Sequence, residues 1–275
     1  MSNKLTREQV EATVKKAWQK AERPNFNGAD LNQVDLSGLN LSMSDLSGAD
    51  LSQADLRRTL LSNTNLIGAD FSGADLSGAD LSEALLSGAI FVQANLSRAN
   101  LIDASLNGAK FLKADLSRAN LNGANLGGAN FKGANLSRSD LSESNLHWTN
   151  FCQADLTGAD LTGASLREAK LDSTTQMDKK WRLVWAIVNQ QASEQDLNGV
   201  DLSGANLRRA DLSMADLSDA NLSGADLSRA NLEDAMLKGA NLENAVLEQV
   251  KISDKQLEAA KSLSGATLPD GTVHK

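Results

Sequence analysis

The stretch ADLSGADLSE, residues 74–83, contains the pattern that decides the fold. It is two copies of a five-residue unit, Ala-Asp-Leu-x-x. The bulky position of this unit, Leu or Phe, returns at every fifth residue from Phe26 to Leu171. Ala usually stands two residues before it, and Asp or Asn directly before it. A strict internal period of this kind predicts a repeat architecture.

A period of five residues fits neither a helix nor a plain strand. Side chains return to the same face every 3.6 residues in a helix and every two in a strand. Each unit therefore needs a turn, and Asp, Asn, Gly and Ser are the residues that turns favour. The chain is expected to bend at every repeat while it buries Ala and Leu on the inside, as in a coil that closes on itself.

A second period of twenty residues indicates how many units close one coil. Phe replaces Leu at intervals of twenty, so four units per coil would stack the rings in one structural column: Phe71, Phe91, Phe111, Phe131 and Phe151. A glycine column from Gly28 to Gly128 has the same period, and so do Arg58, Arg98, Arg118 and Arg138. These coincidences predict a square β-solenoid with coils about 4.8 Å apart.

The repeat closely resembles that of the pentapeptide-repeat family. Units such as Ala74-Asp75-Leu76 and Ala99-Asn100-Leu101 are similar to the A(D/N)LXX unit of that family. The resemblance implies an all-β solenoid, a right-handed quadrilateral β-helix with Leu, Phe and Ala facing inward. It implies little about activity, because most members of the family, which is abundant in photosynthetic bacteria, have no assigned biochemical role.

The breaks in the repeat predict five segments. Residues 1–24 are expected to form an N-terminal capping helix that starts with a capping box of Thr6 and Gln9 and stops before Pro24. The others are a first β-helix array at 25–171, a helical insertion at 172–196, a second array at 197–252 and a C-terminal capping helix and tail at 253–275. The second array is expected to continue the solenoid, either stacked on the first or at an angle to it.

The inserted helix is expected to be capped by Thr174 or Thr175 and to carry Trp181 and Trp185 on its apolar face. Because apolar residues cover more than half of its circumference, we expect this face to be buried, against the coils or in a homodimer through helical segments. A protruding recognition helix is the alternative. The C-terminal helix is expected to start with a capping box of Ser253 and Gln256 and to cap the far end.

Composition narrows the possible environments and activities. The formal net charge is -8 and the sequence pI about 4.9. A single Cys excludes an internal disulfide and favours a reducing compartment such as the cytoplasm. No secretory leader is recognised, and no apolar run is long enough to insert into a membrane.

The residues needed for catalysis are scarce. The chain has no Tyr and two His, of which His274 lies beside the C-terminal residue and His147 is internal. We expect no catalytic residues, no cofactor and no metal site, because His147 and Cys152 have no companion ligands and the Ser residues have no His-Asp partners. The chain is not expected to be an enzyme.

Function is therefore expected on the outer surface. The candidate interaction residues are the basic column, the helical tryptophans and a group of apolar side chains at positions that the repeat usually makes polar: Arg98, Arg118, Arg138, Trp181, Trp185, Leu85, Ile90, Val92 and Leu112. A matching acidic column, Glu83, Asp103 and Glu143, could simply neutralise the arginines.

The sequence favours a non-catalytic structural or protein-interaction solenoid with an unidentified protein partner. The alternative is a DNA mimic that modulates a type II topoisomerase, as the resemblance implies for some acidic members of the family. About half of the acidic residues occupy the turn position before Leu, where Asn is nearly as common, so the negative charge has a structural origin. Direct binding of nucleic acid is not expected.

Overall fold

The computed structural model describes residues 4–190 and 192–275, which form two compact units. One unit extends to Asp160 and includes Glu168–Met177, and the other contains Leu161–Arg167 and Asp178–Lys275. The division differs from the expected segments, because residues 161–167 of the first repeat array group with the later part of the chain.

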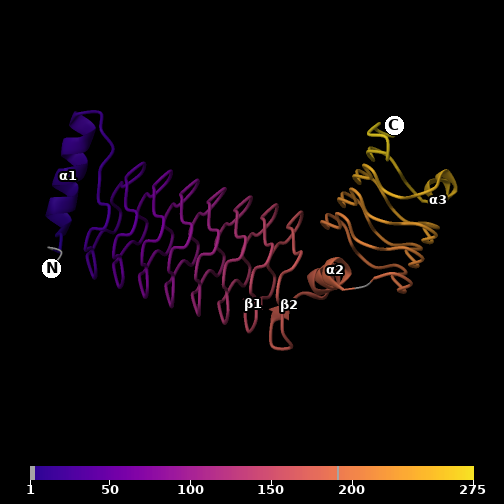
Figure 1. Cartoon of the computed structure of the whole chain (residues 1–275), viewed down its shortest axis with the longest axis horizontal. Coiled ribbons are helices and arrows are strands. Elements are labelled where there is room, and N and C mark those ends of the chain that lie inside the picture. Colours follow the sequence, from indigo (N-terminus) through magenta and orange to yellow (C-terminus); the bar gives the residue numbers. More distant parts are fainter. Residues whose placement is uncertain (1–3, 191) are drawn as a thin grey trace. The chain divides into compact units, whose positions relative to one another are not determined.

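The first unit is a stack of square coils (Figure 1), which confirms the predicted β-helix. Parallel bridges join residues twenty apart, as in Asp75 to Asn95 and Asn95 to Asp115. The N–H of Leu76 donates to the carbonyl of Asn95 at 2.7 Å, and that of Gly78 donates to Ser97 at 3.0 Å. Each coil is therefore one rung of four short parallel ladders.

The corner of each coil explains the repeat unit. The carbonyl of Leu76 accepts from the N–H of Ala79 at 2.9 Å, which closes a turn, and the N–H of Ser77 donates to Asp75 Oδ1 at 2.9 Å. The residue two after each central Leu or Phe has a left-handed backbone, with φ 65° at Gly78. Glycine adopts this conformation without steric cost, which accounts for its frequency there.

The core is a solid column of hydrocarbon. Central Leu and Phe side chains are almost all 0–1% exposed, and the Ala residues beside them are nearly as well buried. The five phenylalanine rings form one stacked column with centroid separations of 4.7, 4.8, 4.5 and 5.4 Å from Phe71 to Phe151. Side chains therefore fill the interior of the described coils.

Helix α1, Arg7–Gln19, lies across the first coil (Figure 1) and starts with the predicted capping box of Thr6 and Gln9. It ends five residues earlier than expected. Ala21 has a left-handed backbone (φ 56°), and the N–H of Glu22 donates to the carbonyl of Ala17, which together terminate the helix. Of its apolar side chains, Val10 is fully buried, whereas Trp18 is 44% exposed.

The first unit ends with a further segment of the ladder at residues 172–177, and not with the expected insertion at residue 172. Strand β2, Gln176–Met177, pairs in parallel with β1, Asp155–Leu156. Thr175 does not cap a helix, because its hydroxyl donates to the carbonyl of Phe151 at 2.9 Å. The hydroxyl bond holds this segment on the coil beneath it.

Helix α2, Lys179–Asn189, belongs to the second unit and has Asp178 at its N-cap, in place of the expected Thr174 or Thr175. Its buried residues are Trp181, Val184 and Ile187. The coils that follow have the same ladder geometry as those of the first unit, as in Asp201 to Asn221.

The second array extends past Ile252, its expected end. Helix α3, Asp254–Glu258, begins with the predicted capping box of Ser253 and Gln256 but interrupts a coil and does not close the stack. Ser262 and Thr267 return to the ladder opposite Asn241 and Val246. Thr267 then pairs antiparallel with Val273, so a hairpin, and not α3, covers the last rung.

Candidate functional site

An open groove of about 900 Å³ lies along one wall of the β-helix in the first unit. We call it the arginine groove. Its lining residues repeat every twenty positions in three columns: Asn95, Asp115, Asn135 and Asp155; Ser97, Ser117, Ser137 and Thr157; Arg58, Arg98, Arg118 and Arg138. The repeat itself therefore builds the groove, and each coil adds one residue to every column.

The floor of the groove is rigid because its polar side chains bond to the backbone and to each other. Asp115 Oδ1 accepts from the N–H of Ser117 at 2.9 Å and from the amide of Asn135 at 3.0 Å. The same turn bond joins Asn135 to the N–H of Ser137 at 3.0 Å. This floor was not predicted from the sequence, although its twenty-residue spacing is a signal that could have revealed it.

The arginines occupy the left-handed corner at the edge of the groove. Arg98, Arg118 and Arg138 have φ values of 60°, 59° and 59°, and their side chains are exposed. The stem of a corner residue leans over the next coil, since a Cβ placed on Gly158 would lie 3.5 Å from Arg138 Cγ. Three consecutive coils therefore present guanidinium groups in one line, and Gly78 leaves a gap before Arg58.

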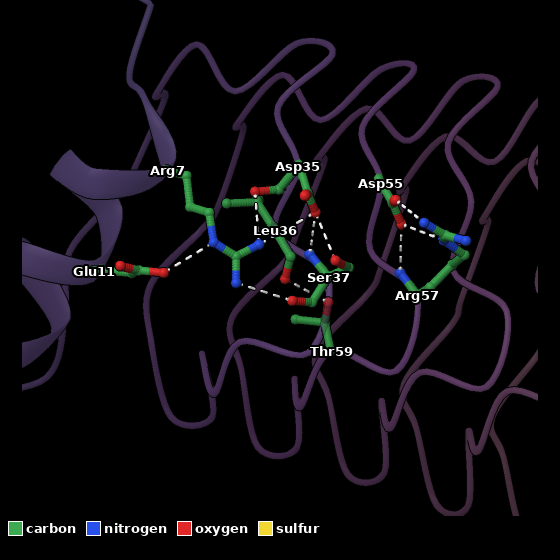
Figure 2. Close-up of polar contacts among 8 residues, drawn as sticks. All are labelled: Arg7, Glu11, Asp35, Leu36, Ser37, Asp55, Arg57 and Thr59. Atoms are coloured by element: carbon green, nitrogen blue, oxygen red, sulfur yellow. Dashed lines mark hydrogen bonds and ion pairs between the residues drawn. The ribbon is translucent and has the colours of Figure 1, made fainter.

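The arginine column has no ion pair within the described residues, whereas basic residues nearer α1 do. Arg7 donates to Asp35 Oδ1 and to the carbonyl of Ser37, both at 3.2 Å, and Arg57 forms two bonds with the carboxylate of Asp55 (Figure 2). Hydrogen bonds from Arg57 lower the pKa of the Asp55 carboxyl. The wall thus has ion-paired arginines at its start and arginines without an ion pair among the described residues farther along.

The acidic column does not neutralise the arginines. Glu83, Asp103 and Glu143 are exposed and form no ion pair in the part of the chain that the structure describes. Asp103 leans over Gly123, where a Cβ would meet its Oδ1 at 2.3 Å. The two columns remain separate charged surfaces.

The candidate apolar residues do not form one patch. Val92 and Leu112 are stacked neighbours, because the N–H groups of Gly73 and Gln93 donate to their carbonyls, and both are half-buried, as is Ile90. Leu85 is 47% exposed. It directly precedes the turn in which the N–H of Ala89 donates to the carbonyl of Leu86. Leu85 thus stands in a different ladder from Ile90, and the stacked pair Val92 and Leu112 is only partly exposed.

The tryptophans of α2 offer little surface. Trp181 is only 7% exposed and Trp185 is half-buried, so neither ring is free to anchor a partner. Trp148 in the first unit is 64% exposed and makes an edge contact with His147, with ring centroids 5.6 Å apart. Cys152 is half-buried and is not disulfide-bonded.

Within residues 4–190 and 192–275, no three His, Cys, Asp or Glu side chains come together as metal ligands. Over the same residues, no helix is both long and apolar enough to span a lipid bilayer.

Comparison with known families agrees with the coil geometry. The family described as pentapeptide repeats matches at residues 22–53, 44–82, 79–118, 114–151, 139–175, 191–224 and 215–254. The chain belongs to the pentapeptide-repeat family. The matches to this family cover both repeat arrays and most of the chain.

Several solved structures of pentapeptide-repeat proteins are similar to this chain. HetL of the cyanobacterium Nostoc sp. strain PCC 7120, described as involved in heterocyst differentiation regulation, is 35% identical over 95% of this chain and 98% of its own, with a TM-score of 0.34. QnrB1, described as a plasmid-mediated fluoroquinolone resistance protein, is 28% identical over 54% of this chain and 77% of its own, with a TM-score of 0.39. Rfr23 of the cyanobacterium Cyanothece 51142 is 25% identical over 61% and 99%, with a TM-score of 0.19.

A search of curated protein sequences finds no significant match.

Proposed function

We propose that this pentapeptide-repeat protein is a non-catalytic interaction solenoid of the cytoplasm that binds a protein partner along the arginine groove. The observation that carries the proposal is the column of Arg98, Arg118 and Arg138, which stands in line and forms no ion pair among the described residues. Stacked like charges raise the energy of the free protein. A partner that supplies opposite charge gains that energy on binding.

A proximity experiment tests this function. A photocrosslinking residue at Ser117, on the groove floor, should capture a protein in cells, and the same residue at Ser82, on another wall, should not. Changing the column to Gln (R98Q/R118Q/R138Q) should abolish capture at Ser117. Gln already occupies left-handed corners at Gln93 and Gln153, so the variant should fold. Equal capture at both positions would contradict the proposal.

DNA mimicry of a type II topoisomerase substrate is the second candidate, and the net charge of -8 favours it. Two features oppose it. Carboxylates such as Asp115 are bonded into turns, and the groove of the first unit carries arginines. A supercoiling assay with gyrase separates the candidates: we expect no change of activity at micromolar excess of the protein, whereas inhibition or protection would favour mimicry.

A further inference from the structure

We infer, on the basis of the proposed function, that the arginine groove takes an acidic α-helix of a protein partner, laid along the solenoid axis with carboxylates on Arg98, Arg118 and Arg138. Guanidinium groups bind carboxylates through two parallel hydrogen bonds, and an exposed arginine without an internal partner is free to do so. The three exposed side chains in successive coils supply three such positions.

The spacing of the column selects a helix. With coils about 4.8 Å apart, the three arginines extend over about 10 Å of the axis. Glutamates at positions i, i+4 and i+7 of an α-helix lie on one face and extend over about 10.5 Å. Alternate residues of an extended strand would extend over about 13 Å, so its third carboxylate would miss the third arginine.

The floor of the groove argues against a nucleic acid. The carboxylates of Asp115 and Asp155 lie beside the arginines. Near the start of the same column, Asp55 is paired with Arg57, but Ser or Thr replaces Arg57 in the later coils, so Asp115 and Asp155 lack such a partner from that position. A phosphodiester chain brings uniform negative charge against these carboxylates. A helix can place neutral or basic side chains over the floor and acidic ones over the arginines.

Arg7 shows how a helix can meet this wall. It lies in the first turn of α1, donates to Asp35 of the floor column, and pairs through Nε with Glu11 one turn later at 2.9 Å (Figure 2). A helix of this chain thus already places a charged side chain on the wall at its first coils. The arginine groove continues that wall, and its arginines form no ion pair among the described residues.

Synthetic peptides test the inference. The probe is a stapled, alanine-based helical peptide with Glu at i, i+4 and i+7, and its affinity is measured by fluorescence anisotropy at about 150 mM salt. We expect it to bind about tenfold more tightly than the same peptide with Gln, or than an isomer with Glu at i, i+2 and i+5. R98Q/R118Q/R138Q should remove this preference, and E83Q/D103N/E143Q should keep it.

A substitution at Gly78 provides a second test, in which binding should become tighter. A Cβ there would be 3.7 Å from Arg58 Cγ, an ordinary contact, so Gly78→Arg should close the gap in the column and tighten binding of a longer peptide with one more Glu turn. Equal affinity for the Glu, Gln and isomeric peptides would overturn the inference, and tighter binding of oligothymidylate than of the Glu peptide would do so too. Crosslinking through Ser117 can succeed in either case, so the proposed function is judged separately.

Discussion

The rings of Phe91 and Phe111 are stacked 4.8 Å apart with their planes 2° from parallel, although twenty residues separate them in the chain. Their separation is the distance between neighbouring strands in a sheet, so the rings report directly on the coil spacing. The ladder bonds and the buried rings therefore share one repeat. Packing on the inside and hydrogen bonding in the wall reinforce each other at every coil.

The ring column should contribute measurably to stability. Phe111→Leu leaves a cavity between two rings and is expected to lower the free energy of unfolding by about 1–2 kcal/mol. The matched control is Phe26→Leu, because Phe26 is also buried, at 3% exposed against 0% for Phe111, but no ring is stacked on it among the described residues. Urea unfolding followed by circular dichroism gives both values. Equal losses would show that stacking adds nothing to burial.

A charge in the core should unfold a whole array. Leu101 is 0% exposed, so Leu101→Asp buries a carboxylate with no partner and is expected to cost more than about 4 kcal/mol. Each coil depends on its neighbours, so the loss should spread along the stack. Ile102→Asp, one residue away and half-buried on the outside, should be mild. An unchanged melting temperature for the Leu101 variant would contradict the solid-core fold.

Two buried hydroxyls on neighbouring coils should respond in opposite directions. Thr64 Oγ1 donates to the carbonyl of Leu41 at 3.1 Å, whereas the buried hydroxyl of Ser44 has no hydrogen-bond partner among the residues that the structure describes. Ser44→Ala is expected to raise the free energy of unfolding by about 1 kcal/mol, and Thr64→Ala should lower it by about 1–2 kcal/mol. A loss of stability in the Ser44 variant would indicate a partner such as bound water.

Corner residues should reveal the backbone strain of the turns. Gly88 has φ 69° and open space where a Cβ would lie, so Gly88→Val adds strain without a clash and is expected to cost about 1–2 kcal/mol. The reverse change at another corner, Gln93→Gly, should relieve strain at φ 57° and gain up to about 1 kcal/mol. Thermal melts of both variants check the signs, and two changes of the same sign would argue against strain.

Acid should weaken the turns below the ordinary pKa of Asp. Asp45 Oδ1 accepts from the hydroxyl of Ser47 at 2.6 Å and from its N–H at 3.0 Å, and these bonds lower the pKa of Asp45. The bond from Ser213 does the same for the pKa of Asp211. A carboxylate whose pKa is lower in the folded state than in the unfolded state stabilises the folded protein above about pH 4. This stabilisation is lost as the pH falls through the pKa of the folded state.

The double variant D45N/D211N isolates the pH-dependent stabilisation that the carboxylates of Asp45 and Asp211 provide. Asn keeps the acceptor oxygen but cannot titrate, so the difference in Tm from the wild type should be constant from pH 7 to about pH 5 and shrink below about pH 4. Melting curves over that range provide the measurement. A difference that grows on acidification would reverse the assigned sign.

The sequence by itself determined the regular part of this protein. Residues that recur every five positions make the same turn, and residues that recur every twenty fall in the same column, so the periods alone align Phe71 with Phe151 and Arg98 with Arg138. The capping boxes at Thr6 and Ser253 were equally readable, because each depends on two residues three positions apart. Local geometry and contacts between neighbouring coils are all that these features require.

The tertiary structure decided everything that breaks the period. It placed residues 172–177 on the ladder and set α3 inside a coil, because both outcomes depend on bonds to distant carbonyls, those of Phe151 and Leu232. It also separated Arg57, which reaches a carboxylate, from Arg98, Arg118 and Arg138, which reach none among the described residues. Side-chain direction at a left-handed corner and the charges within its reach are properties of the assembled wall, so only the folded chain shows which arginines are left free.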